Sequence, residues 1–186
     1  MANSDAPFGF RPINRDGSPY NGATTKAYFL ATDTTAAFIG DAVFHSGTSA
    51  SGVPEVSQAA AGEDVYGVIV GFDVNPDDLS AQYRKASTLR HCKLASADST
   101  FFEAQDDGTI GAASAGLNAA FIVGSGNTTY GTSGMEIDST TELSTNSLDL
   151  MLIAPVDRED NDGTAANAKW VVKFNQSQTR PGREGV

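Results

Sequence analysis

The sequence predicts an all-β fold, a single β-sandwich or barrel domain of about nine short strands. Three observations indicate this fold. Charged residues make up only 19% of the 186-residue chain, and the Gly, Ala, Ser and Thr that replace them suit strands and turns better than surface helices. Short runs rich in β-branched and aromatic residues recur between turn signals. No segment sustains the 3.6-residue period of an amphipathic helix.

The expected strands recur along the whole chain. In order, they cover residues 26–31, 37–45, 53–56, 65–74, 88–95, 100–105, 119–123, 148–156 and 169–174. The run VYGVIVGFDV at 65–74 is the strongest, and its nearly continuous apolarity predicts a buried central strand. Residues 88–95 alternate, which places His91 and Cys92 on opposite faces of their strand.

Helical signals are few. Residues 79–85 follow Pro76 and two aspartates, a pattern that favours one or two helical turns. Residues 112–120 are rich in alanine but are interrupted by Gly116. Three stretches low in apolar residues are expected to be loops, and they cover residues 46–52, 124–134 and 157–167. The last of these is acidic, so it must be solvated or paired.

Both ends of the chain look different from the middle. We expect an extended N-terminal arm at residues 1–24, a β-rich domain at 25–175 and a C-terminal tail at 176–186. The arm is too polar for a signal peptide. It combines aromatic and cationic residues that are typical of protein contacts, and those expected to bind a partner are Phe8, Phe10, Arg11, Arg15 and Tyr20. The alternative is that its aromatic side chains fold back onto their own domain.

The tail has a composition like that of the arm, and Arg180 and Arg183 are weaker candidates for partner contacts. Its default interpretation is a disordered tail. The net charge also differs between the two ends and the middle of the chain. The net charge is −11, residues 1–30 and 175–186 each carry +1, and residues 31–174 therefore carry −13. Such an acidic body argues against nucleic acid as the partner and fits basic ends that touch an acidic protein.

Cys92 is the only cysteine, so no intrachain disulfide can form. No run approaches 18 apolar residues, and we therefore expect no membrane partner and a cytoplasmic origin.

No residue pattern predicts catalysis, and we expect no enzyme, no cofactor and no catalytic residues. His45 is the only histidine besides His91, and two histidines and one cysteine are too few for a structural zinc site without carboxylates. No phosphate-binding loop or nucleophile elbow occurs. An EF-hand with Gly163 at its sixth position would place the cations Arg158 and Lys169 at ligand positions, so that motif fails. An irregular cation site in residues 157–167 stays open beside a solvated loop.

Several sequence blocks resemble one family. They are APFGFRP at 6–12, DGSPYNG at 16–22, FIGDAV at 38–43, VYGVIVGF at 65–72, YRKAST at 83–88, GLNAAF at 116–121, GSGNTTYGTSGMEID at 124–138 and ANAKWVVKFN at 166–175. Together they extend over nearly the whole chain. They resemble the capsid decoration, or cement, proteins of tailed bacteriophages.

The resemblance implies a non-enzymatic virion structural protein with a jelly-roll-like or barrel-like fold. Such a protein binds the outer surface of the expanded capsid, bridges major capsid proteins and stabilises the head. It would be made in the host cytoplasm and act as a homo-oligomer, with a homotrimer favoured and a dimer possible. The arm model further predicts that a chain lacking residues 1–22 folds but no longer binds capsids.

Two alternatives stay open. One is a virion adhesin or carbohydrate-binding β-module that uses Tyr130, since Trp170 is expected in the core. The other is a different minor head or tail component.

Overall fold

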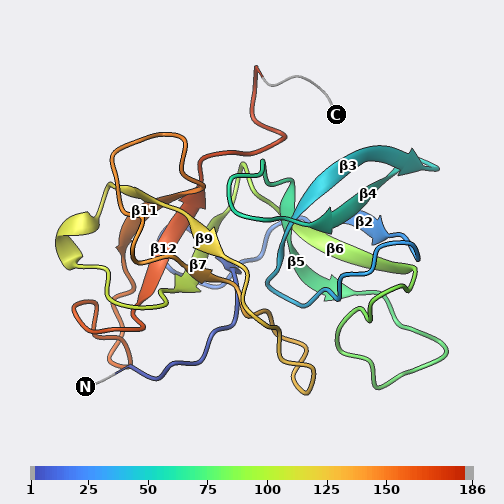
Figure 1. Ribbon diagram of the computed structural model, residues 1–186, viewed down its shortest axis with the longest axis horizontal. Coiled ribbons are helices and arrows are strands. Elements are labelled where there is room, and N and C mark those ends of the chain that lie inside the picture. Colours follow the sequence, from blue (N-terminus) through green and yellow to red (C-terminus); the bar gives the residue numbers. More distant parts are fainter. Residues whose placement is uncertain (1–2, 183–186) are drawn as a thin grey trace.

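Short apolar strands and glycine-rich turns build an all-β chain, which confirms the predicted fold class. The computed structural model describes residues 3–182, which contain twelve β-strands and one short 3₁₀-helix, η1 (Ala112–Ser114). The strands form a closed barrel and a five-stranded sheet that lie side by side (Figure 1). There are more strands than expected because several contain only two or three residues, too few for a periodic pattern to reveal.

The barrel contains the five strands β2 (Thr25–Phe29), β3 (Ala42–Ala50), β4 (Val53–Gln58), β5 (Gly67–Phe72) and β6 (Arg90–Ser96). Their order is β2-β4-β3-β5-β6, and β2 pairs back onto β6. The β2–β4 pair is parallel, and the other four pairs are antiparallel. Its interior holds Val43, Val56, Ile69 and Leu94. Closure rests on short ladders at two of these contacts, because β2 meets β4 at one residue pair and β3 meets β5 at two.

The sheet contains β1 (Arg11–Ile13), β7 (Phe101–Gln105), β12 (Lys169–Phe174), β11 (Leu150–Pro155) and β8 (Asn118–Ala119), in the order β1-β7-β12-β11-β8. All of its pairs are antiparallel. A two-stranded ribbon of β9 (Phe121–Ile122) and β10 (Glu136–Ile137) completes this part. The bounds of β12 match the expected strand, and the expected strand at residues 119–123 lies partly in β8 and partly in β9.

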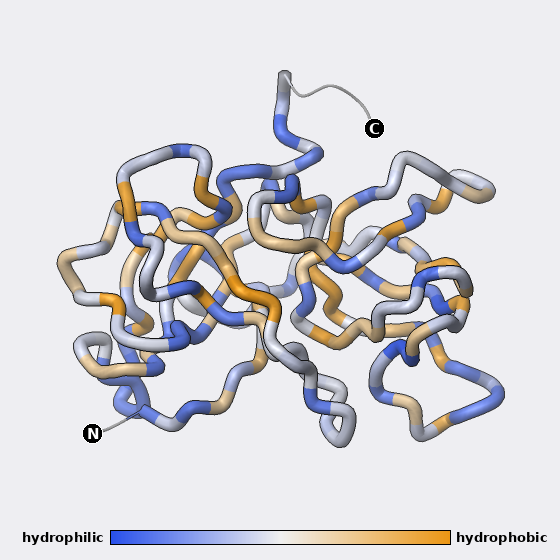
Figure 2. Tube along the Cα trace, viewed as in Figure 1, coloured by the Kyte–Doolittle hydropathy of each residue, from blue (hydrophilic) through white to orange (hydrophobic). Residues whose placement is uncertain are grey.

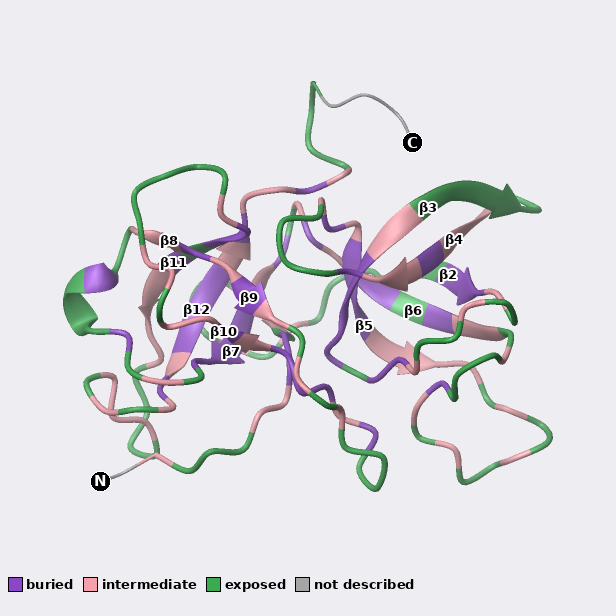
Figure 3. Cartoon of the chain, in the orientation of Figure 1, coloured by how far each residue is buried: buried purple, intermediate pink, exposed green. Residues whose placement is uncertain are grey.

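One hydrophobic cluster joins the barrel to the sheet. Trp170 and Phe102 enter it from the sheet, and Val68 and Ala95 enter it from the barrel. Buried segments occur on the strands of both parts (Figure 3), where the most hydrophobic stretches also lie (Figure 2). Because the two parts share this core, each helps to shield the apolar surface of the other from water.

The prediction of a loop at residues 46–52 is wrong. β3 extends to Ala50 and forms a hairpin with β4, and the exposed outer half of β3 is visible in Figure 3. Ser51 and Gly52 form its turn, with φ of +52° and +77°. Two consecutive positive φ values match the right-handed twist of a hairpin, and this explains how a polar sequence still supports a strand.

The expected helix at residues 79–85 is also absent from the structure. Arg84 explains why, because its side chain is fully buried and donates hydrogen bonds to the carbonyl oxygens of Leu30, Thr35, Asp33 and Thr88. These bonds hold the chain around Arg84 in an irregular loop. The alanine-rich segment at 112–120 contains only the single turn η1, with Ala119 already in β8.

The expected tail begins inside the folded part. Gln176 and Gln178 form backbone hydrogen bonds with Val65, at 2.8 and 3.0 Å. The side chain of Gln178 also accepts from the His45 amide at 2.7 Å and donates to the His45 carbonyl at 3.2 Å. These bonds tie the end of the sheet to the barrel, because they satisfy backbone groups that would otherwise need water.

Candidate functional site

The N-terminal segment, residues 3–24, lies on its own domain. Asn3 donates hydrogen bonds to the carbonyl oxygens of Asp162 and Ala166, both at 3.0 Å. Gln105 of β7 accepts from the Ala6 amide at 3.1 Å and donates to the Ser4 carbonyl at 2.6 Å. β1 then pairs with β7 as the edge strand of the sheet. The expected extended arm is therefore, at residues 3–24, a segment docked on its own domain, and residues 1–2 lie outside the described residues.

Phe10 is the clearest correction among the expected partner contacts. It is only 1% exposed, and its ring packs edge-on against Phe102, Phe121 and Phe174. Burial of a phenylalanine side chain contributes roughly 2–3 kcal/mol to folding, so Phe10 fills the chain's own core and cannot anchor a neighbour in this conformation. The alternative, in which arm aromatics fold back, is the outcome at this position.

Two glycines allow the segment to pass directly against the barrel. Gly9 has φ of +72°, and a Cβ built there would lie 2.5 Å from the Gly40 carbonyl oxygen. Gly40 has φ of +97°, and its Cβ would lie 2.5 Å from the Phe8 carbonyl oxygen. Both positions exclude larger residues through conformation and space. Gly9, which stands between two aromatic residues in APFGFRP, is the sequence signal for this close approach to Gly40. Strand periodicity alone does not reveal it.

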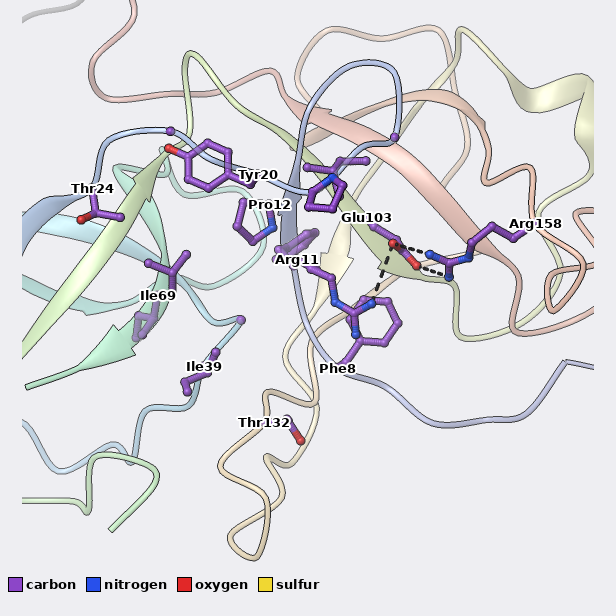
Figure 4. A pocket seen from close by; sticks show the side chains of 17 residues that line it. Phe8, Arg11, Pro12, Tyr20, Thr24, Ile39, Ile69, Glu103, Thr132 and Arg158 are labelled. Atoms are coloured by element: carbon purple, nitrogen blue, oxygen red, sulfur yellow. Dashed lines mark hydrogen bonds and ion pairs between the residues drawn. The ribbon is translucent and has the colours of Figure 1, made fainter. Parts of the chain in front are cut away.

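A pocket of about 720 Å³ lies where the N-terminal segment faces the barrel, and we call it the seam pocket. Three of the expected contact residues, Phe8, Arg11 and Tyr20, line it (Figure 4). The buried Phe10, a fourth expected contact residue, borders it as well. Its accessible apolar surface comes chiefly from Ile39 before β3 and Val70 of β5, and the buried Ile13 of β1 and Ile69 of β5 also border it. Arg15 is exposed and does not line the pocket.

A buried carboxylate organises the charged end of the seam pocket. Glu103 of β7 is 3% exposed, and Arg158 donates to both of its oxygens, at 2.7 and 3.1 Å. Arg11 Nη1 lies 4.0 Å from Glu103 Oε2, and its guanidinium stands 4.5 Å from the centre of the Phe8 ring (Figure 4). The hydrogen bonds to Glu103 raise the pKa of Arg158 above its ordinary value. Two cations therefore share one buried anion.

Glu103 and Arg158 were missed as site residues. Arg158 stands in the acidic loop 157–167, which the sequence required to be solvated or paired, and the structure shows pairing. Asp160 accepts from Lys169 at 2.7 Å and from Arg158 at 3.1 Å, and these bonds, the first most of all, hold the pKa of its carboxyl below the ordinary value. The partner of Arg158 on β7 is 55 residues away in sequence, so no local pattern could reveal it.

A second pocket of about 630 Å³ adjoins the first. Phe8, Arg11 and Arg158 line both pockets, and the second adds Ser4, Ala6, Asp160 and Lys169. The Phe8–Arg11 pair therefore separates an apolar space from a more polar one.

The remaining expected contact residues lie elsewhere. Arg180 is exposed, donates to the Asn175 carbonyl at 3.0 Å and lines neither pocket, and Arg183 lies outside the described residues. The first and last described stretches of the chain, near residues 3 and 182, lie at well-separated edges of the molecule in Figure 1. Tyr130 is 70% exposed in the loop 124–134, and Trp170 is fully buried in the core as expected.

The residues tested for catalysis are not assembled into a dyad. Cys92 is fully buried in the barrel, and this burial raises the pKa of its thiol to about 12. The His91 ring instead packs 5.9 Å from the Tyr28 ring on β2. Within residues 3–182, no group of three or more His, Cys, Asp or Glu side chains is placed to hold a metal ion.

The part of the chain that the structure describes contains no helix long and apolar enough to cross a membrane. Comparison with known proteins gave no matching family model, no matching curated protein and no matching solved structure.

Proposed function

We propose that this chain is a non-enzymatic virion structural protein that binds the outer surface of a tailed-phage capsid and bridges major capsid proteins. The observation that carries the proposal is the seam pocket, which is built largely from the family-like block APFGFRP and its neighbours. An apolar pocket with a half-exposed arginine at its mouth is typical of protein contacts.

Such binding would stabilise an expanded head by a simple physical effect. A molecule bound across two capsid proteins buries surface that must be exposed again before those proteins separate. The cost is roughly 25 cal/mol per Å² of apolar surface. If the chain acts as a homotrimer, as we favour, several such contacts act together, and the effective concentration of each additional contact is high.

In this proposal the N-terminal segment forms one wall of the binding pocket and does not act as a free arm. Because Phe10 belongs to the core, removal of residues 1–22 is expected to unfold the sheet rather than to remove binding alone. Single surface substitutions are the better test. Arg11 and Arg15 are both exposed arginines of the N-terminal segment, and only Arg11 lines the pocket.

The test compares Arg11→Gln with the matched control Arg15→Gln. Expanded heads that lack the protein are incubated with each purified chain, and the bound fraction is measured by co-sedimentation. We expect Arg11→Gln to weaken binding about tenfold or more, because one charge-assisted contact is lost at every copy. Arg15→Gln should bind like the wild type. Equal binding by all three chains would contradict the proposed interface, and absence of wild-type binding would contradict the function.

The exposed Tyr130 favours one second candidate, a carbohydrate-binding β-module. A glycan array separates the two, because a capsid-binding protein gives no hits there. Saturable glycan binding that is lost in Tyr130→Ala would favour the alternative. The location of the chain in intact particles, by immunogold labelling, would distinguish capsid decoration from a minor tail component.

A further inference from the structure

We infer that the seam pocket recognises an acidic–apolar peptide segment of the partner protein, in which aliphatic or aromatic side chains alternate with carboxylates. The inference deepens the proposed function, because it rests on a protein partner and names the chemistry of the segment that this partner inserts.

Arg11 is the group that would bind a carboxylate of the peptide. Its Nη1 is 4.0 Å from Glu103 Oε2, too far for a hydrogen bond, while Arg158 donates to both oxygens of Glu103. The Arg11 side chain is 56% exposed, and its guanidinium is held over the Phe8 ring. A guanidinium that is already positioned in this way loses little side-chain freedom when it binds a carboxylate through two N–H groups.

The opposite wall of the pocket would take an apolar side chain. Ile39 is exposed and Val70 half-buried on the barrel side, and the half-buried Tyr20 lines the pocket from the N-terminal segment. The buried Ile13 and Ile69 lie behind this surface. The Tyr20 hydroxyl already donates to the Ala23 carbonyl at 2.8 Å, so its ring presents mainly an apolar surface. An inserted leucine or phenylalanine would displace water from this wall.

Charge complementarity selects an acidic segment over a basic one. The two adjoining pockets are lined by three cations, Arg11, Arg158 and Lys169, and by two anions, Glu103 and Asp160, which leaves an excess of one positive charge. The whole chain carries −11. A carboxylate is therefore attracted to this site and repelled by most of the remaining surface, which also guides its approach.

The test uses the full chain and two synthetic peptides. One is an N-acetylated, C-amidated hexapeptide that alternates leucine with aspartate, and the other replaces each aspartate by asparagine. Binding is measured by ¹⁵N-HSQC titration at low salt. We expect the aspartate peptide to shift the amides of residues 8–13 and 39–40 and to bind at least tenfold more tightly than the asparagine peptide. Raising the salt to about 0.5 M should reduce this preference.

Two variant pairs localise the effect. Arg11→Gln should reduce the affinity for the aspartate peptide about fivefold to tenfold, and Arg15→Gln should leave it within about twofold. Ile39→Asp should abolish binding, while Leu143→Asp, the same change at an exposed apolar residue outside the pocket, should not. The ¹⁵N spectrum of each free variant confirms that it folds.

Several outcomes would overturn the inference. These are equal binding of the two peptides, tighter binding of the asparagine peptide, no shifts at the named residues, and equal losses in Arg11→Gln and Arg15→Gln. The failures are distinguishable from those of the proposed function. A chain that decorates heads but ignores the aspartate peptide refutes the inference alone. A chain that binds the peptide at this pocket but never binds heads refutes the capsid role alone.

Discussion

Phe10 shows how one side chain changes the meaning of a whole segment. In sequence it is an aromatic residue in a proline- and glycine-rich stretch, which is typical of a contact arm. In the structure its ring lies 4.9 Å from the Phe174 ring and 5.7 Å from the Phe121 ring, and its amide donates to the Gly40 carbonyl at 2.9 Å. Phe10 is thus a core residue that helps to hold the N-terminal segment on the domain.

We predict that Phe10→Ala lowers the free energy of unfolding by about 3–5 kcal/mol, because it leaves a cavity among the other phenylalanines. The measurement is urea unfolding followed by Trp170 fluorescence. Phe8→Ala is the matched control, and it should cost much less because Phe8 is only half-buried at the pocket. Equal losses in the two variants, or a loss below about 1 kcal/mol for Phe10→Ala, would show that Phe10 does not occupy the core in solution.

Among the elements, the short strand β10 carries an unusual carboxylate. Glu136 Oε1 is buried and has no hydrogen-bond partner in the described part of the chain. Burial, followed by the charges of Asp5, Asp107 and Asp106, raises the pKa of Glu136 to about 7. Asp106 at the end of β7 also has its pKa raised, to about 6, chiefly by burial. The N-terminal segment and the ends of β7 and β10 thus bring several negative charges together.

The raised pKa of Glu136 makes the stability of the fold depend on pH. The folded chain keeps a proton on Glu136 that the unfolded chain releases above its ordinary pKa of 4.5. The contribution of this group to stability is therefore complete at low pH and is lost as the pH rises towards 7.

We predict that Glu136→Gln raises the free energy of unfolding at pH 7.5 by on the order of 1 kcal/mol, a value reduced for partial solvent screening. The two proteins should converge near pH 4.5, where the carboxyl is protonated. Denaturant unfolding at both pH values measures this difference. Glu159→Gln, at an exposed position, is the control for loss of one surface charge. A variant less stable than the wild type at pH 7.5 would contradict the prediction.

For the whole molecule, the shared core decides whether barrel and sheet are independent. The cluster around Trp170 includes Val68 and Ala95 from the barrel, and the Val65–Ser177 bridge ties the end of the sheet to the barrel. Separating the two parts would expose this cluster to water. The chain should therefore unfold as one cooperative unit.

The chain contains a natural probe for each part, since Trp170 is its only tryptophan and Cys92 its only cysteine. Trp170 lies in the sheet and Cys92 in the barrel, and both are fully buried. We predict coincident guanidinium midpoints for Trp170 fluorescence and for pulse labelling of Cys92 with a thiol reagent. The thiol becomes reactive only on unfolding, because it is buried with a raised pKa. Labelling that precedes the fluorescence change would show that the barrel opens on its own.

Local sequence patterns predict the positions of several strands correctly. β12 matches its expected bounds, and β5 and β6 lie within or near theirs, because alternation and β-branched residues are local signals. The outer half of β3 was missed because its residues are small and polar, and only pairing with β4 makes them a strand. The irregular chain around Arg84 was missed because its carbonyl partners include residues about 50 positions away.

Some residues of the site, too, could be predicted from the sequence, and others could not. Phe8, Arg11 and Tyr20 were predicted from residue type alone, and they line the seam pocket. Glu103 and Arg158 were not predicted, because they lie 55 residues apart in the chain and are brought together by the sheet. Ile39 was not predicted, because it reaches the pocket only where the barrel side meets the N-terminal segment.

By itself, the sequence determined the all-β class, most strand positions, the acidic body and the residue types of the N-terminal segment. Composition and short-range periodicity carry that information. Only the tertiary structure decided that Phe10 belongs to the core, that Arg158 satisfies Glu103, and that Arg11 remains at the mouth of an apolar pocket. Those outcomes depend on contacts between residues far apart in the chain, and the requirement to bury apolar rings and pair buried charges selects them.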